Sequence, residues 1–474
     1  MKKLLLTLFF LSIFTAAYSQ QKIFGINYNG SVLTLNRHTF FRICDTTHSG
    51  NYLLAGSASG HLGSSYAYAV VDKNGAPLWV KDSAIFTSIG KHWASFSYGL
   101  RTHDHGFVFC GSLSNFGTAN ESAIFILKTD SSGNELWRKN VQQFQLGNAD
   151  VIYQSPDSSL YFTGFRRDSI SNILNSFLLK LSNSGDVLFM RQFPLIGIEN
   201  YLLSIENKFI IGGATSYIDS ATQKIYNKIS LISTDTSGNF LSSHSLIDST
   251  YTIYLGSISK TADNNILISC SKQDSTQQGF LQLMKVDTAA NIIWTDTIST
   301  NQYYPIVARE LPNGNILIAY GDYYVEERNS LGDTIWTYHF DDNVSNFASS
   351  TVNSMLALDN STFLISGRIG YSSPSGSSPY LMKISNLLPS PIFELDAEDS
   401  FIIYPNPASN NFSIRLKSEL KDAKLEIVNV IGEKLYSFNL KNKEERFNAN
   451  LQPGIYFVRV GENEEYFYRK LIIQ

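Results

Sequence analysis

The stretch Val71-Asp-Lys-Asn-Gly-Ala-Pro-Leu-Trp79 decides the fold, because the chain repeats it. The same order of an extended segment, a tight turn and an aromatic residue returns at 129–137 and at 181–189. Weaker copies end near Leu241, Trp294, Trp336 and Phe393, so successive aromatic positions lie about 42 to 58 residues apart. Four of the five tryptophans of the chain occupy this one position. Periods of this size are typical of propellers and solenoids.

Each copy follows a second apolar segment with its own turn, so a unit contains four extended segments, called A to D in chain order. The Asp-x-x-Gly turn between C and D suits a short hairpin in which glycine takes a positive φ. The B segments number seven and lie at 51–56, 106–111, 160–164, 208–213, 265–269, 315–319 and 362–367. Seven four-stranded units predict an all-β chain with a seven-bladed β-propeller. Residues 22–27 resemble a stray strand D that would complete the last blade.

We expect the aromatic residue on strand D to pack against the next blade, where losing a Trp or Phe costs about 3–5 kcal/mol. The repeated phrase resembles the tryptophan-docking repeat of quinoprotein-type propellers. The chain has no adjacent cysteine pair, and the phrase lacks the usual Thr before the Gly. A quinoprotein dehydrogenase is therefore disfavoured, and we predict no cofactor.

Composition changes near residue 396, after which charged residues rise from about 14% to about 29% of positions. This last part opens with Ile402-Ile-Tyr-Pro-Asn-Pro-Ala408, continues through a strand, glycine turn and strand at 425–435, and has a Pro-Gly-x-Tyr block at 451–460. The order of these motifs resembles the type A C-terminal sorting domain of the type IX secretion system. The motif residues are Tyr404, Pro405, Asn406, Pro407, Gly432, Pro453, Gly454 and Tyr456.

The resemblance implies a small antiparallel β-sandwich that the type IX secretion machinery reads as an address at the outer membrane. Such a domain is commonly removed during export, and the cargo is released or attached to surface lipopolysaccharide. An immunoglobulin-like binding module is the alternative interpretation of the same strand pattern.

The first residues have the pattern of a secretory signal peptide. Lys2 and Lys3 precede an apolar run over 4–17, and Ala17-Tyr18-Ser19 supplies the small residues of a cleavage site. The run is shorter than the roughly 20 residues of a membrane-spanning helix, so we expect no spanning segment in the mature chain. We predict a signal peptide at 1–19, the propeller at 20–388, a linker at 389–400 and the sorting domain at 401–474. The protein would pass through the periplasm and be extracellular or on the outer cell surface.

The charge and the cysteine and histidine residues of the chain do not predict a nucleic-acid or metal partner. The formal net charge of -4 provides no basic surface, so we expect no nucleic-acid partner. Cys44, Cys110 and Cys270 have no close neighbours in sequence. Cys110 and Cys270 lie at the same point of similar apolar runs and are predicted to be small buried strand residues. His103-Asp-His-Gly106 falls where every unit has its A–B turn, so turn residues are favoured there and we predict no metal site.

Acidic residues give no clear catalytic pattern. The turn at 72–75 contains only short pieces of a calcium-binding loop. The neighbouring pairs Glu326 and Glu327, and Asp341 and Asp342, are expected to be solvated. A glycosidase needs two carboxyl groups that meet across a pocket, which a sequence alone does not reveal. The sequence leaves catalysis open but favours a non-catalytic protein.

We predict a secreted or cell-surface propeller that binds an extracellular protein or glycan and is exported through the type IX secretion system. A glycan-active hydrolase or lyase on the same scaffold, and a structural or adhesive surface protein, are the alternatives. The B–C loops and D–A crossings share one end of the blades and vary widely in length, and binding commonly lies on variable loops. The candidate binding residues are Trp93, Tyr303 and Tyr304, which lie in D–A crossings and offer aromatic contact area.

Overall fold

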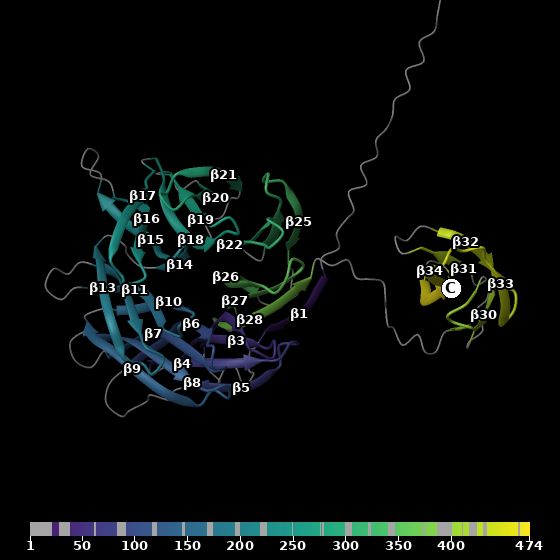
Figure 1. The fold of residues 1–474 in the computed structure, drawn as a ribbon, viewed down its shortest axis with the longest axis horizontal. Coiled ribbons are helices and arrows are strands. Elements are labelled where there is room, and N and C mark those ends of the chain that lie inside the picture. Colours follow the sequence, from purple (N-terminus) through teal and green to yellow (C-terminus); the bar gives the residue numbers. More distant parts are fainter. Residues whose placement is uncertain are drawn as a thin grey trace, which may run out of the picture. The chain divides into compact units, whose positions relative to one another are not determined.

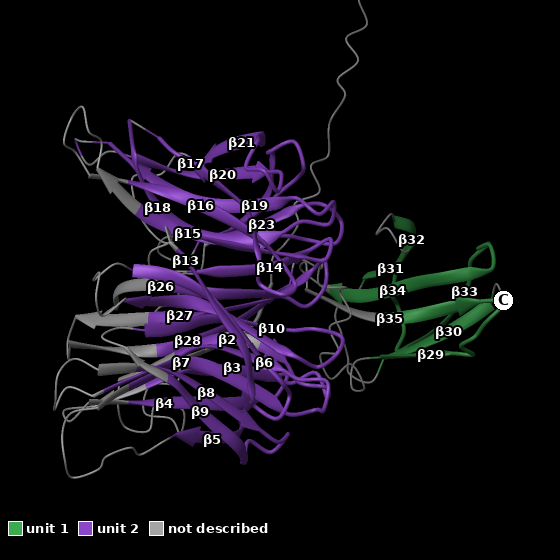
Figure 2. Ribbon diagram, turned by 60° about the vertical axis from the view of Figure 1, so that its left-hand side comes forward, with its two compact units in different colours: residues 1–21, 387–474 green, residues 22–386 purple. Residues whose placement is uncertain are grey.

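The computed structural model describes most of the chain as two compact units, shown in different colours in Figure 2. The described residues are 21–27, 38–60, 63–82, 92–115, 121–144, 147–167, 174–194, 200–218, 225–248, 250–274, 276, 279–298, 306–320, 324–339, 347–372, 375–385, 401–409, 411–416, 424–429, 434–462 and 465–474. One unit is Lys22–Asn386, and the other contains Leu387–Gln474. The predicted signal peptide and linker lie outside the described residues.

The larger unit is a ring of seven antiparallel blades (Figure 1). Blade 1 contains β2 (His38–Thr46), β3 (Tyr52–Gly60), β4 (Gly63–Val71) and β5 (Pro77–Asp82). Blade 2 contains β6 (His92–Arg101), β7 (Phe107–Asn115), β8 (Glu121–Thr129) and β9 (Glu135–Phe144). Blade 3 contains β10 (Gly147–Gln154), β11 (Leu160–Arg167), β12 (Leu174–Leu181) and β13 (Val187–Pro194). Blade 4 contains β14 (Tyr201–Ile205), β15 (Lys208–Ile218), β16 (Ile225–Asp235) and β17 (Phe240–Leu246). Blade 5 contains β18 (Thr252–Lys260), β19 (Ile266–Gln273), β20 (Gly279–Val286) and β21 (Ile292–Ile298). Blade 6 contains β22 (Ile306–Glu310), β23 (Ile316–Tyr320), β24 (Tyr324–Arg328) and β25 (Thr334–His339). The predicted seven-bladed β-propeller is confirmed.

The last blade draws its strands from distant parts of the chain. Its inner strands are β26 (Phe347–Ala357), β27 (Thr362–Ser372) and β28 (Ser375–Ser385), and β1 (Gln21–Asn27) pairs with β28 as the outer strand. Figure 1 shows β1, in purple, beside the green β28. The predicted ring closure by residues 22–27 is therefore confirmed. Blades 1 and 2 also share one sheet, because Gly63 and Ser64 of β4 pair in parallel with the start of β6.

The hydrophobic cores of the propeller lie between blades rather than within them. Leu53 of blade 1, for example, packs in one cluster with Phe109 of blade 2. Six further clusters join the remaining neighbours, and the one containing Tyr52 and Leu364 joins blade 7 to blade 1. A fully buried Leu or Phe side chain contributes about 1.5–3 kcal/mol, so each blade depends on both neighbours for its stability.

The repeated C–D turns position the aromatic residues of strand D. In these turns the first side chain, such as that of Asp72 or Asp130, accepts two backbone N–H groups, and the glycine adopts a positive φ. A Cβ on Gly133 would lie 2.9 Å from the Trp79 ring of the preceding blade. Likewise, Trp137 lies against the next turn, and its Nε1–H donates to Asn183 O at 3.2 Å. The predicted packing of the strand D aromatic on the next blade is confirmed at these interfaces.

The smaller unit is a two-sheet antiparallel sandwich. One sheet has the order β29 (Phe401–Tyr404), β30 (Asn411–Leu416) and β33 (Glu444–Asn448). The other has the order β32 (Lys434–Asn439), β31 (Lys424–Val428), β34 (Gly454–Glu462) and β35 (Glu465–Ile473). Phe412 from the first sheet and Ile427, Val458 and Leu471 from the second are fully or almost fully buried in one core. This arrangement confirms the predicted β-sandwich.

Candidate functional site

The structure describes only part of the binding site predicted from the sequence. Trp93 is the second residue of β6, opposite Ser114 of β7 and beside Ser64 of β4. Its side chain, Tyr303 and Tyr304 lie outside the described residues. The grouping of these three aromatics therefore remains a prediction.

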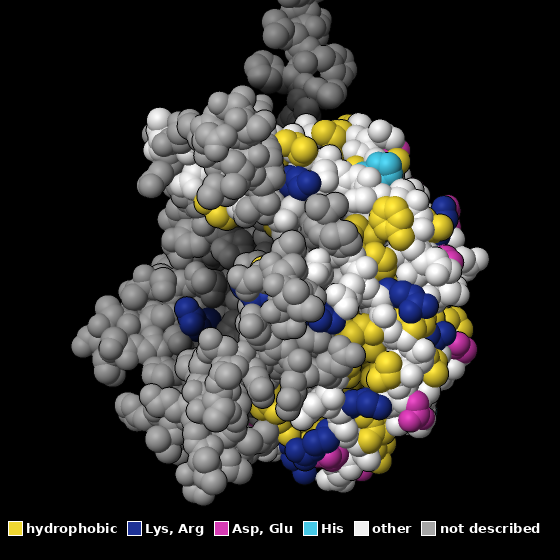
Figure 3. Space-filling model, turned by 90° about the vertical axis from the view of Figure 1, so that its left-hand side faces the viewer, with side chains coloured by type: hydrophobic (Ala, Val, Ile, Leu, Met, Phe, Trp, Pro, Cys, Tyr) yellow, Lys and Arg dark blue, Asp and Glu magenta, His cyan; other side chains and the backbone are white. Residues whose placement is uncertain are grey.

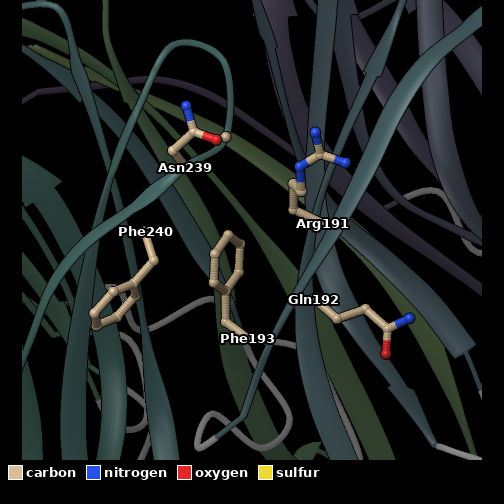
Figure 4. Close-up of a pocket in the computed structure, with 6 residues that line it drawn as sticks. Arg191, Gln192, Phe193, Asn239 and Phe240 are labelled. Carbon is tan, nitrogen blue, oxygen red and sulfur yellow. The ribbon is translucent and has the colours of Figure 1, made fainter.

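A groove lies at the rim between blades 3 and 4. Its lining residues come from β13 and from the turn into β17, and they are Arg191, Gln192, Phe193, Gly238, Asn239 and Phe240. Figure 4 shows the two segments, with Phe193, Phe240, Asn239 and Arg191 around this hollow and Gln192 pointing away from it. Phe193 is buried, whereas Phe240 is 58% exposed. Figure 3 views this side of the ring, where apolar side chains reach the surface among Lys and Arg.

The strand D aromatic beside the groove is a phenylalanine, where the two preceding blades have a tryptophan. Phe189 takes the position that tryptophan holds at the two preceding interfaces, and a Cβ on Gly238 would lie 2.8 Å from its ring. The Arg191 guanidinium carbon lies 5.4 Å from the Phe189 ring centroid, which is a cation–π distance. A phenyl ring therefore occupies the docking position here in place of an indole, against Gly238, which lines the groove.

β-Bulges on the innermost strands bring polar groups of neighbouring blades together. Strand A carries a bulge in blades 1, 2, 3, 5 and 7, and in blade 3 the extra residue is Asp150. Both the backbone N–H and the side-chain amide of Asn200, at the start of blade 4, donate to Asp150 Oδ2, at 3.1 and 3.2 Å. Asn148 donates to the other oxygen and also contacts Ser97 of blade 2. Burial nevertheless raises the pKa of Asp150 to about 6.

Asp150 should make the propeller less stable as the pH rises. An exposed aspartate has a pKa near 3.9. Between about pH 4 and 6, the Asp150 carboxyl is therefore ionised in the unfolded chain but still protonated in the folded protein. At pH 7 Asp150 is ionised in the folded wild type as well, and the full cost of burying its charge is present. Between pH 4 and pH 7 the free energy of unfolding of Asp150→Asn should therefore rise by about 2–3 kcal/mol relative to that of the wild type. Urea unfolding of both proteins at the two pH values measures this difference. A difference between them that does not change with pH would contradict the assignment.

The two neighbouring glutamates of blade 6 are buried, which corrects the expectation that they are solvated. Glu326 and Glu327 are 3% and 2% exposed. They lie on the two faces of β24, and both faces of this strand are covered by adjacent blades. Arg328 pairs with Glu326 at 2.7 Å, while Asn315 and Trp336 donate to Glu327. All these carboxylate contacts are internal to blades 5 and 6.

The histidine-rich turn is structural. Thr102 and His105 close it through a backbone hydrogen bond, and His105 takes the positive φ that glycine has in sister turns. Asp104 pairs with the buried Lys128 at 2.9 Å. No cluster of three or more His, Cys, Asp or Glu side chains suited to a metal occurs within the described ranges. Cys110 and Cys270 are fully buried, as predicted, whereas the side chain of Cys44 is not described.

The sorting motif holds the end of the chain. The side-chain amide of Asn406 donates to Lys470 O at 2.6 Å and accepts from Ile472 N–H at 2.9 Å, as an adjacent strand would. Tyr404 donates to Glu444, and the Arg415 guanidinium carbon lies 5.3 Å from the Tyr404 ring centroid.

The other motif residues lie at turns and at the start of β34. Pro405 and Pro407 are exposed beside Asn406, and both follow cis peptide bonds. Pro453 and Gly454 lead into β34, where Tyr456 donates to Gln452 O at 2.8 Å. Gly432 lies outside the described residues.

Comparison with known proteins identifies the smaller unit. Residues 402–474 match the family described as the secretion system C-terminal sorting domain. No curated protein matches the chain. Among the residues that the structure describes, no helix has the length and apolar character needed to cross a membrane.

Solved structures that resemble the chain do so at low identity. A protein of unknown function from Dyadobacter fermentans is 12% identical with a TM-score of 0.46, over 77% of this chain and 99% of that one. The β-propeller domain of the Trilobed protease from Pyrococcus furiosus is 9% identical with a TM-score of 0.44, over 75% and 98%. BamB from Moraxella catarrhalis is 10% identical with a TM-score of 0.38, over 77% and 99%. Similarity this low transfers no function to this chain.

The fold and the family match define a class. The chain is a β-propeller that carries a type IX secretion sorting domain. It is therefore handled by the type IX secretion machinery and delivered across the outer membrane to the cell surface or the exterior.

Proposed function

We propose that the exported propeller is a non-catalytic binding module for an extracellular glycan. The groove between blades 3 and 4 is the observation that carries this proposal. Its walls combine the exposed ring of Phe240 with the guanidinium of Arg191 and the side-chain amide of Asn239, and none of its lining residues is acidic. An aromatic ring offers contact area to the C–H face of a sugar, while amides and guanidinium groups hydrogen-bond its hydroxyls.

The residues of the groove differ in their freedom to contact a sugar. Asn239 donates to Asp235 Oδ2 at 2.8 Å, which holds its amide in place. Arg191 is exposed on β13 and is the main polar group of the opposite wall, whereas the side chain of Gln192 points to the other face of the strand. Since β13 is the outer strand of its sheet, the groove is open at the rim of the ring. A polysaccharide suits such an open site better than a small ligand does.

Trp93, Tyr303 and Tyr304 remain a second proposed contact area, at the variable-loop end of the blades. The groove is lined by a C–D turn and by β13, and it includes none of these three residues. The two areas can consequently be tested by separate substitutions.

Replacing Phe240 with Ser together with Arg191 with Gln should weaken polysaccharide binding by tenfold or more, because the ring and the guanidinium form opposite walls. Affinity electrophoresis against a panel of neutral and acidic polysaccharides measures the effect. Leu136→Ser, which removes a side chain that is 59% exposed in another blade, is the matched control. The triple variant with Ala at 93, 303 and 304 tests the loop area in the same assay.

Each outcome has a distinct meaning. Loss of binding only in the groove variant supports the groove, and loss only in the triple variant transfers the site to the loops. A wild-type protein that binds no polysaccharide but captures a protein would contradict the glycan proposal. Release of oligosaccharide products would favour the alternative of a glycan-active hydrolase or lyase.

A further inference from the structure

The sheet of β31, β32, β34 and β35 in the sorting domain has an outer face of unusual composition. Alternate residues of β31, β34 and β35 point into the core, including Leu425, Ile427, Val458 and Leu471. The intervening residues therefore form the opposite face, away from the first sheet. In an antiparallel sheet such an outward face is commonly polar and solvated. Here we call it the outer face of β31–β34–β35, together with the adjoining part of β32.

The middle of this outer face is apolar. Val428 of β31 is opposite Phe457 of β34, and Ile455 of β34 is opposite Ile472 of β35. Ile455 is 46% exposed, and Leu435 of the adjoining β32 is 38% exposed. Side chains of four neighbouring strands thus form one apolar strip, in which Val428 is itself buried, on a face of the sheet that the core does not use.

Three cations surround a single carboxylate beside this strip. Glu426 is 2% exposed, and its oxygens lie 3.2 Å from Lys424 Nζ and 3.3 Å from Lys434 Nζ. Arg459 completes the cluster, with its Nε donating to Glu426 Oε2 at 2.7 Å. Burial disfavours the charged form of Glu426, but the hydrogen bonds from Arg459 and Lys424 outweigh it and lower its pKa to about 2. At neutral pH the cluster therefore carries two uncompensated positive charges.

The cations are exposed enough to meet a partner. The side chains of Lys424 and Lys434 are 42% and 51% exposed, whereas that of Glu426 is buried. Among the described side chains of this face, Glu426 is the one acidic residue. A protein that buried the strip would thus meet positive charge at its margin, so the complementary partner is an acidic surface with an apolar centre.

We propose that the outer face of β31–β34–β35 is the surface by which the sorting domain docks on an acidic, partly apolar protein surface of the type IX secretion machinery. The family match establishes that this machinery handles the domain, and the charge and apolar strip select the face. This contact is separate from the Asn406 amide, which holds the chain end within the sandwich.

The test substitutes Lys424→Gln and Lys434→Gln together in the full chain and leaves Arg459 to neutralise Glu426. Expressed in a bacterium with a type IX secretion system, this variant should be exported about tenfold less and accumulate in the periplasm, because long-range attraction to the partner is lost. Ile455→Ser, which leaves every charge in place, should also reduce export. The pair Lys441→Gln and Lys443→Gln, on exposed lysines outside this sheet, is the matched control. A chain that lacks residues 402–474 defines complete loss of export.

Thermal unfolding of each purified variant separates docking from folding, and wild-type stability with lost export supports the proposal. Export of both variants at the wild-type level overturns it. Vesicles of phosphatidylcholine and phosphatidylglycerol test the other anionic partner, a lipid surface. Wild-type binding to these vesicles that the Lys424 and Lys434 substitutions abolish also overturns the proposal, since the cations would then serve a membrane.

Discussion

Replacing Arg328 with Met is expected to lower the free energy of unfolding of the propeller by about 3–5 kcal/mol. The guanidinium lies between two blades, with Nε 2.7 Å from Glu326 Oε1 and Nη1 2.6 Å from Asp296 Oδ2. Tyr320 and Thr334 also donate to Glu326, so the oxygens of this carboxylate are hydrogen-bonded inside the protein. Without Arg328, a buried negative charge loses its counter-ion. The midpoint of urea unfolding measures the loss.

A matched ion pair on the surface provides the control. Arg138 pairs with Glu135 through two hydrogen bonds, but the two side chains are 51% and 35% exposed. Arg138→Met should therefore cost less than about 1 kcal/mol. The double variant Glu326→Gln with Arg328→Met should recover much of the loss, since the amide carries no charge but still accepts hydrogen bonds. Equal effects of the two single Arg substitutions would contradict the role given to Arg328.

The propeller could be predicted because its signals are local and repeated. An Asp-x-x-Gly turn before Trp79 gives hairpin geometry and docking residue within nine positions, and the chain repeats this signal blade after blade. The sequence suggested one way to close the ring, because residues 22–27 resemble a strand D, but the pairing of β1 with β28 follows from the structure. Repetition supplied the evidence that a single copy would have lacked.

The buried glutamates show where the same reasoning failed. Glu326 and Glu327 are adjacent, so they point to opposite faces of β24, and a strand in the third position of a blade is covered on both faces. The period of two and the position in the repeat together pointed to burial. We expected both residues to be solvated because they are charged, and did not weigh their position in the repeat. Arg328, directly after them in the sequence, was a candidate counter-ion for a buried carboxylate.

Asp150 and the groove depend on contacts that no sequence pattern announces. A β-bulge adds one residue to strand A without a characteristic motif, yet it decides that Asp150 meets Asn200 of the next blade. The groove needs Phe193 and Phe240 from two blades, and no motif in the sequence marks it. In the sorting domain the motif was recognised, but the pairing of Asn406 with the chain end follows from the three-dimensional structure.

Gly133→Ala is expected to destabilise the propeller by about 3–4 kcal/mol, through two additive causes. The residue has φ +77, and an alanine in this left-handed conformation costs about 1–2 kcal/mol. The new Cβ would also lie 2.9 Å from the Trp79 ring, so the ring must leave the turn of the next blade. Trp79→Ala alone should cost about 3 kcal/mol, because the indole also packs against Tyr68 and Phe107.

Gly314→Ala isolates the backbone cost, since Gly314 has φ +83 and no atom within 4 Å of the added Cβ. It should destabilise by about 1–2 kcal/mol. In the Trp79→Ala background, Gly133→Ala should fall to this same value, because no ring remains to be displaced. The non-additivity between residues 79 and 133, measured by urea unfolding of the two single variants and the double variant, is thus the energy of aromatic docking between blades. If Gly133→Ala costs the same with and without Trp79, the turn glycine serves only its own hairpin, and the repeated aromatic holds the ring together through other contacts.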